Sequence, residues 1–286
     1  MKIISAEIAR AAHDLKRRLR TFLDAMGFCE MVTPVLRNGK LRTCMELNLR
    51  STLASGFDRV YEIGTCFREE QSDSTHLSEF QMLELFWSCA SFDKLVNLTH
   101  HLFETVFQCT MDEFATLDLA QCLPERYSGF EYGMEFRRLR VWAQRYLDAK
   151  ELETCDRAYK IYNLLIDHYI GERVPGTLKR PAMVINYPME TICLAKPQKN
   201  HPERILRAEF FIGGIELAHG FVDDMDHKHV AKRMLENGNE FYDKPFLELL
   251  EKKILPPSSG VGFGLERLLM LSCGVSDIRE CVYEWE

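Results

Sequence analysis

The sequence predicts an α+β fold, because segments with the alternation of antiparallel β-hairpins lie among segments with helical periodicity. Two hairpins are expected, one between residues 59 and 87 and the other between residues 208 and 218. A glycine-rich strand at 260–264 runs into an apolar helix. With 286 residues, 46% of them hydrophobic and 28% charged, the chain has a globular composition and can bury a sizeable core. Its length is compatible with one large domain carrying an insertion or with two domains.

The net charge and the spacing of the cysteines argue against several classes of function. Lys and Arg number 36 against 43 Asp and Glu, so the net charge of −7 argues against a nucleic-acid coat or a polybasic membrane binder. No apolar run approaches the ~20 residues that span a bilayer, and the first residues are not a signal peptide. A cytoplasmic location without a membrane partner is expected. The 10 cysteines include no Cys-x-x-Cys pair, which argues against a zinc ribbon.

The first expected element is an amphipathic helix over residues 8–26, which ends at Gly27. Its polar face carries a basic cluster from Lys16 to Arg20, which is typical of a solvated face but could contact a phosphate backbone. A short strand over residues 28–34 follows. Further along, residues 95–169 have a helical pattern that is interrupted near 124–133, and we interpret them as a helical insertion at the rim of a sheet.

The first hairpin comprises residues 59–68 and 80–87, with a long polar loop at 69–79 between them. By alternation, four side chains of its second strand share one face: Phe80, Met82, Glu84 and Phe86. An aromatic face beside Arg68 and His76 suits a flat, anionic ligand such as a nucleotide. Glu84 either binds an ammonium group or is a solvated strand residue, and the hairpin alone favours neither.

The second hairpin has a Gly-Gly turn at 213–214 between two apolar runs. This turn places Glu209 opposite Ala218, and therefore diagonal to Glu216 on the same face, within ~7–8 Å. Two such carboxylates repel each other unless a cation lies between them. Mg²⁺ held by one or two carboxylates and substrate phosphates is a common solution. The alternative is that each Glu is paired with a Lys or Arg of the chain.

The glycines at 260, 262 and 264 alternate, so they line one face of a strand and allow a ligand to approach the backbone. Arg267 then lies in the first turn of the following helix. The run lacks the Gly-Lys-Ser/Thr of a phosphate-binding loop and the spacing of a dinucleotide fingerprint. Taken alone, such a run more often marks tight strand packing.

In order along the chain, three segments resemble the signature motifs of class II aminoacyl-tRNA synthetases. Residues 27–34 are similar to motif 1, residues 67–80 to motif 2 and residues 260–267 to motif 3. Residues 187–190 and 209–223 most resemble lysyl-tRNA synthetase. The glycine-rich motif and the loop tip also have features of pyrrolysyl-tRNA synthetase. The resemblance covers nearly the whole chain.

The resemblance implies one catalytic domain over residues 1–286, an antiparallel sheet flanked by helices, and a helical insertion at about 110–180. It implies ATP and Mg²⁺ as cofactors and a homodimer formed through motif 1. The residues that it assigns to ATP binding are Arg68, Glu70, His76, Phe80, Glu209, Glu216 and Arg267. Among them, Arg68 and Arg267 are the expected catalytic residues, and Glu209 and Glu216 the expected metal ligands. The residues that it assigns to the amino acid are Glu46, Glu84, Phe86, His219 and Asp223.

The chain also departs from the lysyl pattern. Motif 1 begins within thirty residues of the start, so we expect no anticodon-binding domain, and the stretch between Pro34 and Glu46 is shorter than in the family. Phe86 replaces a tyrosine that donates a hydrogen bond, His219 replaces an asparagine, and Asp223 replaces a glutamate. Simple alternation from Glu216 points His219 away from the metal face, so its assigned role requires a bulge near Gly220.

We therefore expect ATP- and Mg²⁺-dependent activation of a lysine-like basic amino acid as an aminoacyl-adenylate. Without an anticodon-binding domain, the expected acceptor is a protein lysine, as in the elongation factor P lysine ligase family, or a small amine or carrier. One alternative is a stand-alone synthetase that charges tRNA. Others are an ammonia-using asparagine synthetase and a catalytically silent regulatory protein. The presence of the expected catalytic residues, Arg68 and Arg267, and of the expected metal ligands, Glu209 and Glu216, argues against silence.

Overall fold

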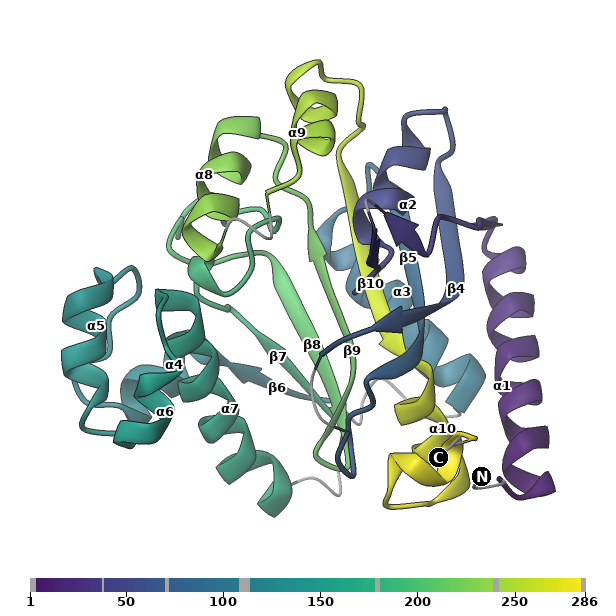
Figure 1. The fold of residues 1–286 in the computed structure, drawn as a ribbon, viewed down its shortest axis with the longest axis horizontal. Helices are drawn as coiled ribbons and strands as arrows, with labels where there is room; N and C mark the ends of the chain where they lie inside the picture. Colours follow the sequence, from purple (N-terminus) through teal and green to yellow (C-terminus); the bar gives the residue numbers. More distant parts are fainter. Residues whose placement is uncertain are drawn as a thin grey trace.

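In the computed structural model, which describes residues 4–37, 39–69, 72–107, 114–177, 181–238 and 242–283, an eight-stranded sheet forms the centre of the molecule (Figure 1). Across the sheet the strands are β1 (Cys29–Glu30), β4 (Arg59–Phe67), β5 (Glu79–Ser88), β10 (Ser258–Gly264), β9 (Ile215–Val222), β8 (Arg207–Ile212), β7 (Ala182–Ile185) and β6 (Ala115–Asp118). Neighbours from β4 to β7 are antiparallel, and the edge strands β1 and β6 pair in parallel. The predicted α+β fold is confirmed, with a mixed sheet.

Helices cover both faces of the sheet. The helices α1 (Ala6–Ala25), α3 (Phe92–Phe107) and α10 (Leu265–Cys273) pack on one face, where Leu83 and Leu85 of β5 join their core. Alternation turns Met82 and Phe86 to the other face, against α2 (Glu46–Leu53). The helices α8 (His227–Asn237) and α9 (Lys244–Glu251) follow β9, and β2 (Leu36–Arg37) pairs with β3 (Lys40–Leu41). The second face carries the candidate site.

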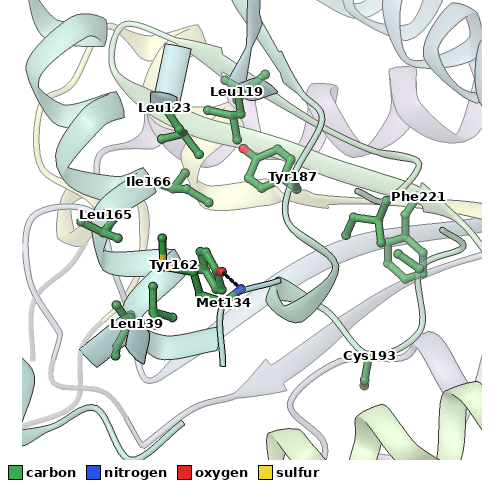
Figure 2. Close-up of a cluster of buried hydrophobic side chains, with 14 of the residues drawn as sticks. Leu119, Leu123, Met134, Leu139, Tyr162, Leu165, Ile166, Tyr187, Cys193 and Phe221 are labelled. Carbon is green, nitrogen blue, oxygen red and sulfur yellow. Dashed lines mark hydrogen bonds between the residues drawn. The ribbon is translucent and has the colours of Figure 1, made fainter. Parts of the chain in front are cut away.

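The segment between α3 and β7 contains α4 (Leu119–Arg126), α5 (Phe136–Ala143), α6 (Ala149–Glu153) and α7 (Ala158–Thr177), at the side of the sheet opposite α1 (Figure 1). These helices share a core with Tyr187 and Phe221, in which the Met134 backbone N–H donates to the Tyr162 hydroxyl at 3.0 Å (Figure 2). The helical pattern was correctly predicted, but β6 was not, and Pro124 lies inside α4. The assignment of this segment as an insertion into a single domain stays a prediction.

The strand predicted at 28–34 is shorter than expected. Only Cys29 and Glu30 pair with β4. At Thr33 the backbone N–H instead donates to the Glu62 carboxylate at 3.0 Å, so the strand ladder ends before Pro34. None of the helices among the described residues is long and apolar enough to cross a bilayer.

Both predicted hairpins are present, but the second contains a bulge. Gly213 and Gly214 have φ values of +61° and +83°, which is the left-handed conformation that a tight hairpin turn requires. Beyond the turn, the register shifts by one residue at Leu217. Glu209 is therefore opposite His219, and the predicted pairing with Ala218 is wrong. Because a bulge reverses the alternation, His219 shares the face of Glu216 without any irregularity near Gly220.

Candidate active site

Two adjoining cavities lie on the face of β5, β9 and β10 that is turned away from α3. The loop cavity, of about 320 Å³, is lined by the β4–β5 loop, the start of α10 and parts of these strands. The α2 cavity, of about 440 Å³, is lined by the segment before α2 and the other end of the same strands. Arg68, His219 and Gly262 line both cavities. They therefore form one cleft with two ends.

Glycine at 260 is required by the close approach of two strands. A Cβ atom at this position would lie 2.3 Å from the Phe86 ring. The ring thus occupies the space that a side chain on β10 would fill. At this position the contact fits the alternative of tight strand packing, because a side chain of the neighbouring strand lies against the glycine.

The loop cavity brings together Arg68, Phe80 and Arg267. The Arg68 guanidinium lies 5.0 Å from the centre of the Phe80 ring. Arg267 donates from Nε to the Thr75 carbonyl at 3.1 Å and from Nη1 to the Glu216 carbonyl at 3.0 Å. An aromatic ring and two guanidinium groups in one cavity suit a planar base with phosphates.

The β4–β5 loop has its own internal support. The Asp73 carboxylate accepts the backbone N–H groups of Thr75 and His76, at 2.6 and 2.8 Å. The His76 ring Nδ1 lies 3.0 Å from the same carboxylate. His76 thus lines the loop cavity as predicted, whereas Glu70 lies outside the described residues.

Glu216 is surrounded by cations of the protein. Its carboxylate lies 3.4 Å from the His219 Nδ1 and 3.7 Å from the Arg267 Nη1. Burial opposes ionisation, but the hydrogen bond and charge of His219 and the charges of Arg267 and Arg207 outweigh it, lowering the pKa of Glu216 to about 2.

Glu209 is held just as closely. It accepts hydrogen bonds from the Arg207 guanidinium and from the Tyr187 hydroxyl. Burial nevertheless raises the pKa of Glu209, against the effect of Arg207. The pairing of each Glu with an Arg of the chain, which the sequence left as an alternative, is therefore present.

The donors fit Mg²⁺ only together with phosphates. The described residues contain no group of three His, Cys, Asp or Glu that could hold a metal ion. Two carboxylates do occur, because Glu216 lines the loop cavity and Glu209 and Glu216 both line a third cavity beside α7. One or two carboxylates with substrate phosphates are the usual magnesium site. This third cavity, of about 330 Å³, is called the α7 cavity below.

The α2 cavity holds two carboxylates with few partners. Glu84 is 5% exposed and accepts only the Met45 backbone N–H, at 2.9 Å, among the hydrogen bonds of the described residues. Burial raises the pKa of Glu84 to about 7, although His219 and this N–H oppose the change. Burial also raises the pKa of Glu46 to about 8, with further contributions from the nearby Asp223 and Glu84. Phe86 lines the same cavity without a polar group.

Asp223 does not line either end of the cleft. Its side chain is 0% exposed, 3.2 Å from the Arg50 Nε, and accepts the Ser258 hydroxyl. Arg50 also lies 3.8 Å from Glu46 and stacks at 4.5 Å on the Phe246 ring. The predicted direct contact of Asp223 with an amino acid is not supported, because Arg50 lies against it behind the cavity wall.

Two arginines of the site, Arg207 and Arg50, were not predicted from the sequence. Arg207 precedes Glu209 by two residues in a strand, so alternation alone could have placed both on one face. Arg50 follows Glu46 by four residues in a helix, which is the spacing of an ion pair. No local signal links Arg50 to Asp223, because 173 residues separate them in the chain.

Comparison with known proteins agrees with this geometry. The profile of tRNA synthetases class II (D, K and N) matches residues 4–283. A lysine–tRNA ligase of Mesomycoplasma hyopneumoniae is 31% identical over 97% of this chain and 64% of its own length. Lysine–tRNA ligases of Carboxydothermus hydrogenoformans and Saccharolobus solfataricus are 31% and 28% identical, over 93% and 96% of this chain.

The chain spans less than two thirds of the length of these relatives, with 62% of the Carboxydothermus protein and 64% of the Saccharolobus protein covered. The family match nonetheless runs through all the segments that form the cleft. The chain belongs to the class II tRNA synthetases of the D, K and N group.

Proposed function

We propose that the protein uses ATP and Mg²⁺ to activate a cationic, lysine-like amino acid as an aminoacyl-adenylate. A carboxylate oxygen of the amino acid attacks the α-phosphorus, and the bond from that phosphorus to the pyrophosphate leaving group breaks. One observation carries the proposal: a cleft whose loop end presents guanidinium groups and an aromatic ring continues into an end with buried, poorly neutralised carboxylates. Such a cleft can bind a nucleotide and a cationic amino acid next to each other.

At the loop end, Phe80 and Arg267 would enclose the adenine. Arg68 lines both cavities, so it is placed to meet the negative charge that develops on the α-phosphate. His76 would contact the outer phosphates, and the same role stays a prediction for Glu70. Catalysis then consists mainly of positioning the two substrates and neutralising charge.

Glu209 and Glu216 would hold the magnesium ion together with ATP phosphates. When bound, the ion neutralises the charge on the phosphates and on the pyrophosphate that leaves. The support for this role is that both carboxylates line the α7 cavity and one of them also lines the loop cavity.

At the α2 end, Glu46 would meet the α-ammonium group and Glu84 the side-chain ammonium group. With Asp223 held by Arg50, Glu84 is the carboxylate available to the side chain, and Phe86 adds no hydrogen bond. The names of the relatives favour lysine. Phe86 stands in the place of a tyrosine and lacks its hydroxyl, which favours a modified lysine or an isomer of lysine.

We propose a protein lysine or a small amine or carrier as the acceptor in place of tRNA. The net charge of −7 supports this, and so do the contacts that two arginines of the basic cluster on α1 make within the protein. There Arg18 donates to the Val106 carbonyl at 2.9 Å, and Arg20 pairs with Glu30 at 2.8 Å. The competing proposal is tRNA charging, which is what the names of the relatives state.

A homodimer formed through the motif 1 region is also proposed. Val32 is 95% exposed, and Leu36 and Leu41, which are partners across the β2–β3 pair, are 62% and 50% exposed. Exposed apolar side chains close together in the chain are typical of protein interfaces. Sedimentation equilibrium of wild type and Val32→Asp tests this, and an unchanged monomer for both would contradict it.

Two measurements test the function. A screen of amino-acid-dependent exchange between pyrophosphate and ATP reports activation without knowledge of the acceptor, and exchange is expected with diamino acids. Acid-precipitable labelling of total tRNA with the amino acid that passes the screen then tests the acceptor. Stoichiometric labelling by low micromolar protein would replace our acceptor with tRNA. Exchange with aspartate alone would favour an asparagine synthetase.

A further inference from the structure

Arg207 occupies a junction between two cavities. It lies on β8 and lines both the loop cavity and the α7 cavity. Its guanidinium donates from Nη2 to the Glu209 carboxylate and lies 4.3 Å from the centre of the Tyr187 ring. Its side chain is 13% exposed. Arg207 is thus a mostly buried cation beside one of the two proposed metal ligands.

Neither carboxylate oxygen of Glu209 is free of a partner. One oxygen accepts from Arg207 and the other from the Tyr187 hydroxyl. Glu216 lines the same two cavities as Arg207. A guanidinium therefore supplies the positive charge that a metal ion would bring to Glu209.

We propose that Arg207 is a placeholder for the metal: it holds Glu209 until Mg²⁺ takes over that carboxylate, and it then turns to the terminal phosphates of ATP. This inference rests on the proposed function. The guanidinium fork fits carboxylates and phosphates equally well and stays charged throughout, so one side chain can serve both partners. Arg207 already lines the loop cavity, where the phosphates are expected.

The placeholder couples the two ligands. Metal alone must break the contact between Arg207 and Glu209 and leave the guanidinium without its hydrogen-bonded carboxylate. Metal together with ATP replaces that contact with one to phosphate. Metal and nucleotide therefore strengthen each other's binding, and by linkage the factor is the same in both directions.

The test is a calorimetric titration of Mn²⁺ into wild type and Arg207→Met, with and without an ATP analogue that cannot be cleaved at the α,β bond. Arg207→Met removes the competitor for Glu209, so Mn²⁺ alone should bind about tenfold more tightly, the scale of one charge-assisted hydrogen bond. At saturating metal, the analogue should bind about tenfold more weakly, because its phosphates lose a donor. A residue that merely supports the fold would weaken both ligands.

Two variants serve as controls. Arg204→Met removes a guanidinium that also stacks on a ring, 5.3 Å from the centre of Tyr132, but lines none of the three cavities. It should leave both affinities unchanged. Arg207→Lys keeps the charge without the fork and should lie between wild type and Arg207→Met. Circular dichroism establishes whether each variant is folded.

The outcomes separate this inference from the proposed function. If wild type catalyses exchange but folded Arg207→Met binds Mn²⁺ alone no more tightly than wild type, only the placeholder is wrong. If Arg207→Met does not fold, the test rests on the Mn²⁺ affinities of wild type and Arg207→Lys. An affinity of wild type for Mn²⁺ that is equal with and without the analogue overturns the placeholder. Wild type that neither binds the analogue nor catalyses exchange contradicts the proposed function itself.

Discussion

The two ends of the cleft use the same residue type in opposite electrostatic settings. At the loop end, Glu216 lies beside His219 and Arg267, and its pKa falls to about 2. At the α2 end, Glu84 has one backbone N–H as its hydrogen-bond partner among the described residues, and its pKa rises to about 7. Both glutamates lie on the same face of one sheet. The difference comes from which cations the fold places next to each.

This comparison explains which ligand each end can take. Cations of the chain already neutralise the carboxylates at the loop end. A ligand there must therefore carry both negative and positive charge, as a nucleotide with a metal ion does. At the α2 end, Glu46 shares Arg50 with Asp223, and Glu84 has no cation within ion-pair distance among the described residues. Buried carboxylates without a counter-ion are costly, and a cationic substrate removes that cost.

The largest effect on activity is expected from a substitution at the loop end. Arg267→Ala removes a cation and the two hydrogen bonds that join α10 to Thr75 and Glu216. Pyrophosphate exchange should fall by about a hundredfold to a thousandfold, the scale for losing one preorganised donor. Arg138→Ala, on the exposed pair with Glu131, is the matched control and should behave as wild type. A folded Arg267→Ala protein with normal exchange would contradict the ATP assignment.

Glu84→Gln tests the α2 end and should have the next largest effect. Gln can still accept the Met45 N–H but cannot pair with an ammonium group, so the KM for a diamino acid should rise by roughly tenfold to a hundredfold. KM for ATP should be unchanged. Both are measured by pyrophosphate exchange.

The same variant should be more stable than wild type at pH 8, by about 1–3 kcal/mol in the free energy of unfolding. The reason is that the folded-state pKa of Glu84, about 7, lies above its ordinary value of 4.5. The wild type therefore loses stability as pH rises between these values, and Gln does not. Chemical denaturation at pH 5 and pH 8 measures the difference, and a variant less stable at both pH values would show that Glu84 is structural.

Binding of a diamino acid at the α2 end should release protons, which the loop end gives no reason to expect. With pKa values of about 7 and 8, Glu84 and Glu46 hold protons in the empty protein at pH 6 that a bound diamino acid must displace. Affinity for the amino acid should rise by about tenfold or more between pH 6 and pH 8. Calorimetry in buffers of different ionisation enthalpy counts the protons released. A pH-independent affinity with no proton release would contradict the assignment of these two carboxylates.

Glu216→Gln should produce the smallest change in stability. Because the folded-state pKa, about 2, is below 4.5, ionised Glu216 stabilises the protein above pH 4.5, and this contribution is lost as pH falls towards 2. The variant should therefore be less stable than wild type at pH 7, by about 1 kcal/mol after allowing for solvent screening. It should also need more Mg²⁺ for exchange. Unchanged Mg²⁺ dependence would make the residue structural.

The sequence was most informative where local rules decide the structure. Gly213 and Gly214 predict the turn, and alternation correctly groups Phe80 with Glu84 on the face that lines the cleft. The bulge at Leu217 was not predictable, because it depends on how β9 fits between β8 and β10. The edge strand β6 was missed for a similar reason, since four residues acquire strand structure only by pairing with β7.

The positions of charged partners depended on the fold even more. Alternation leaves open whether Glu209 and Glu216 share a bound cation or pair with cations of the chain. The fold places Arg207 beside Glu209 and Arg267 beside Glu216. Asp223 shows the opposite case: its chemistry suggests a ligand contact, but Arg50, far away in the chain, lies 3.2 Å from its carboxylate, and the ligand contact stays a prediction. Residue type indicated the chemistry of the site, whereas long-range packing decided which charges remain available.

The central claim is tested most directly by comparing lysine with norleucine, which has the same carbon chain but no side-chain ammonium group, in the pyrophosphate-exchange assay. Wild type should prefer lysine, or a related diamino acid, by about a hundredfold, and Glu84→Gln should lose most of that preference. Exchange by wild type that is as fast with norleucine, or that occurs with aspartate and with no diamino acid, would contradict the account.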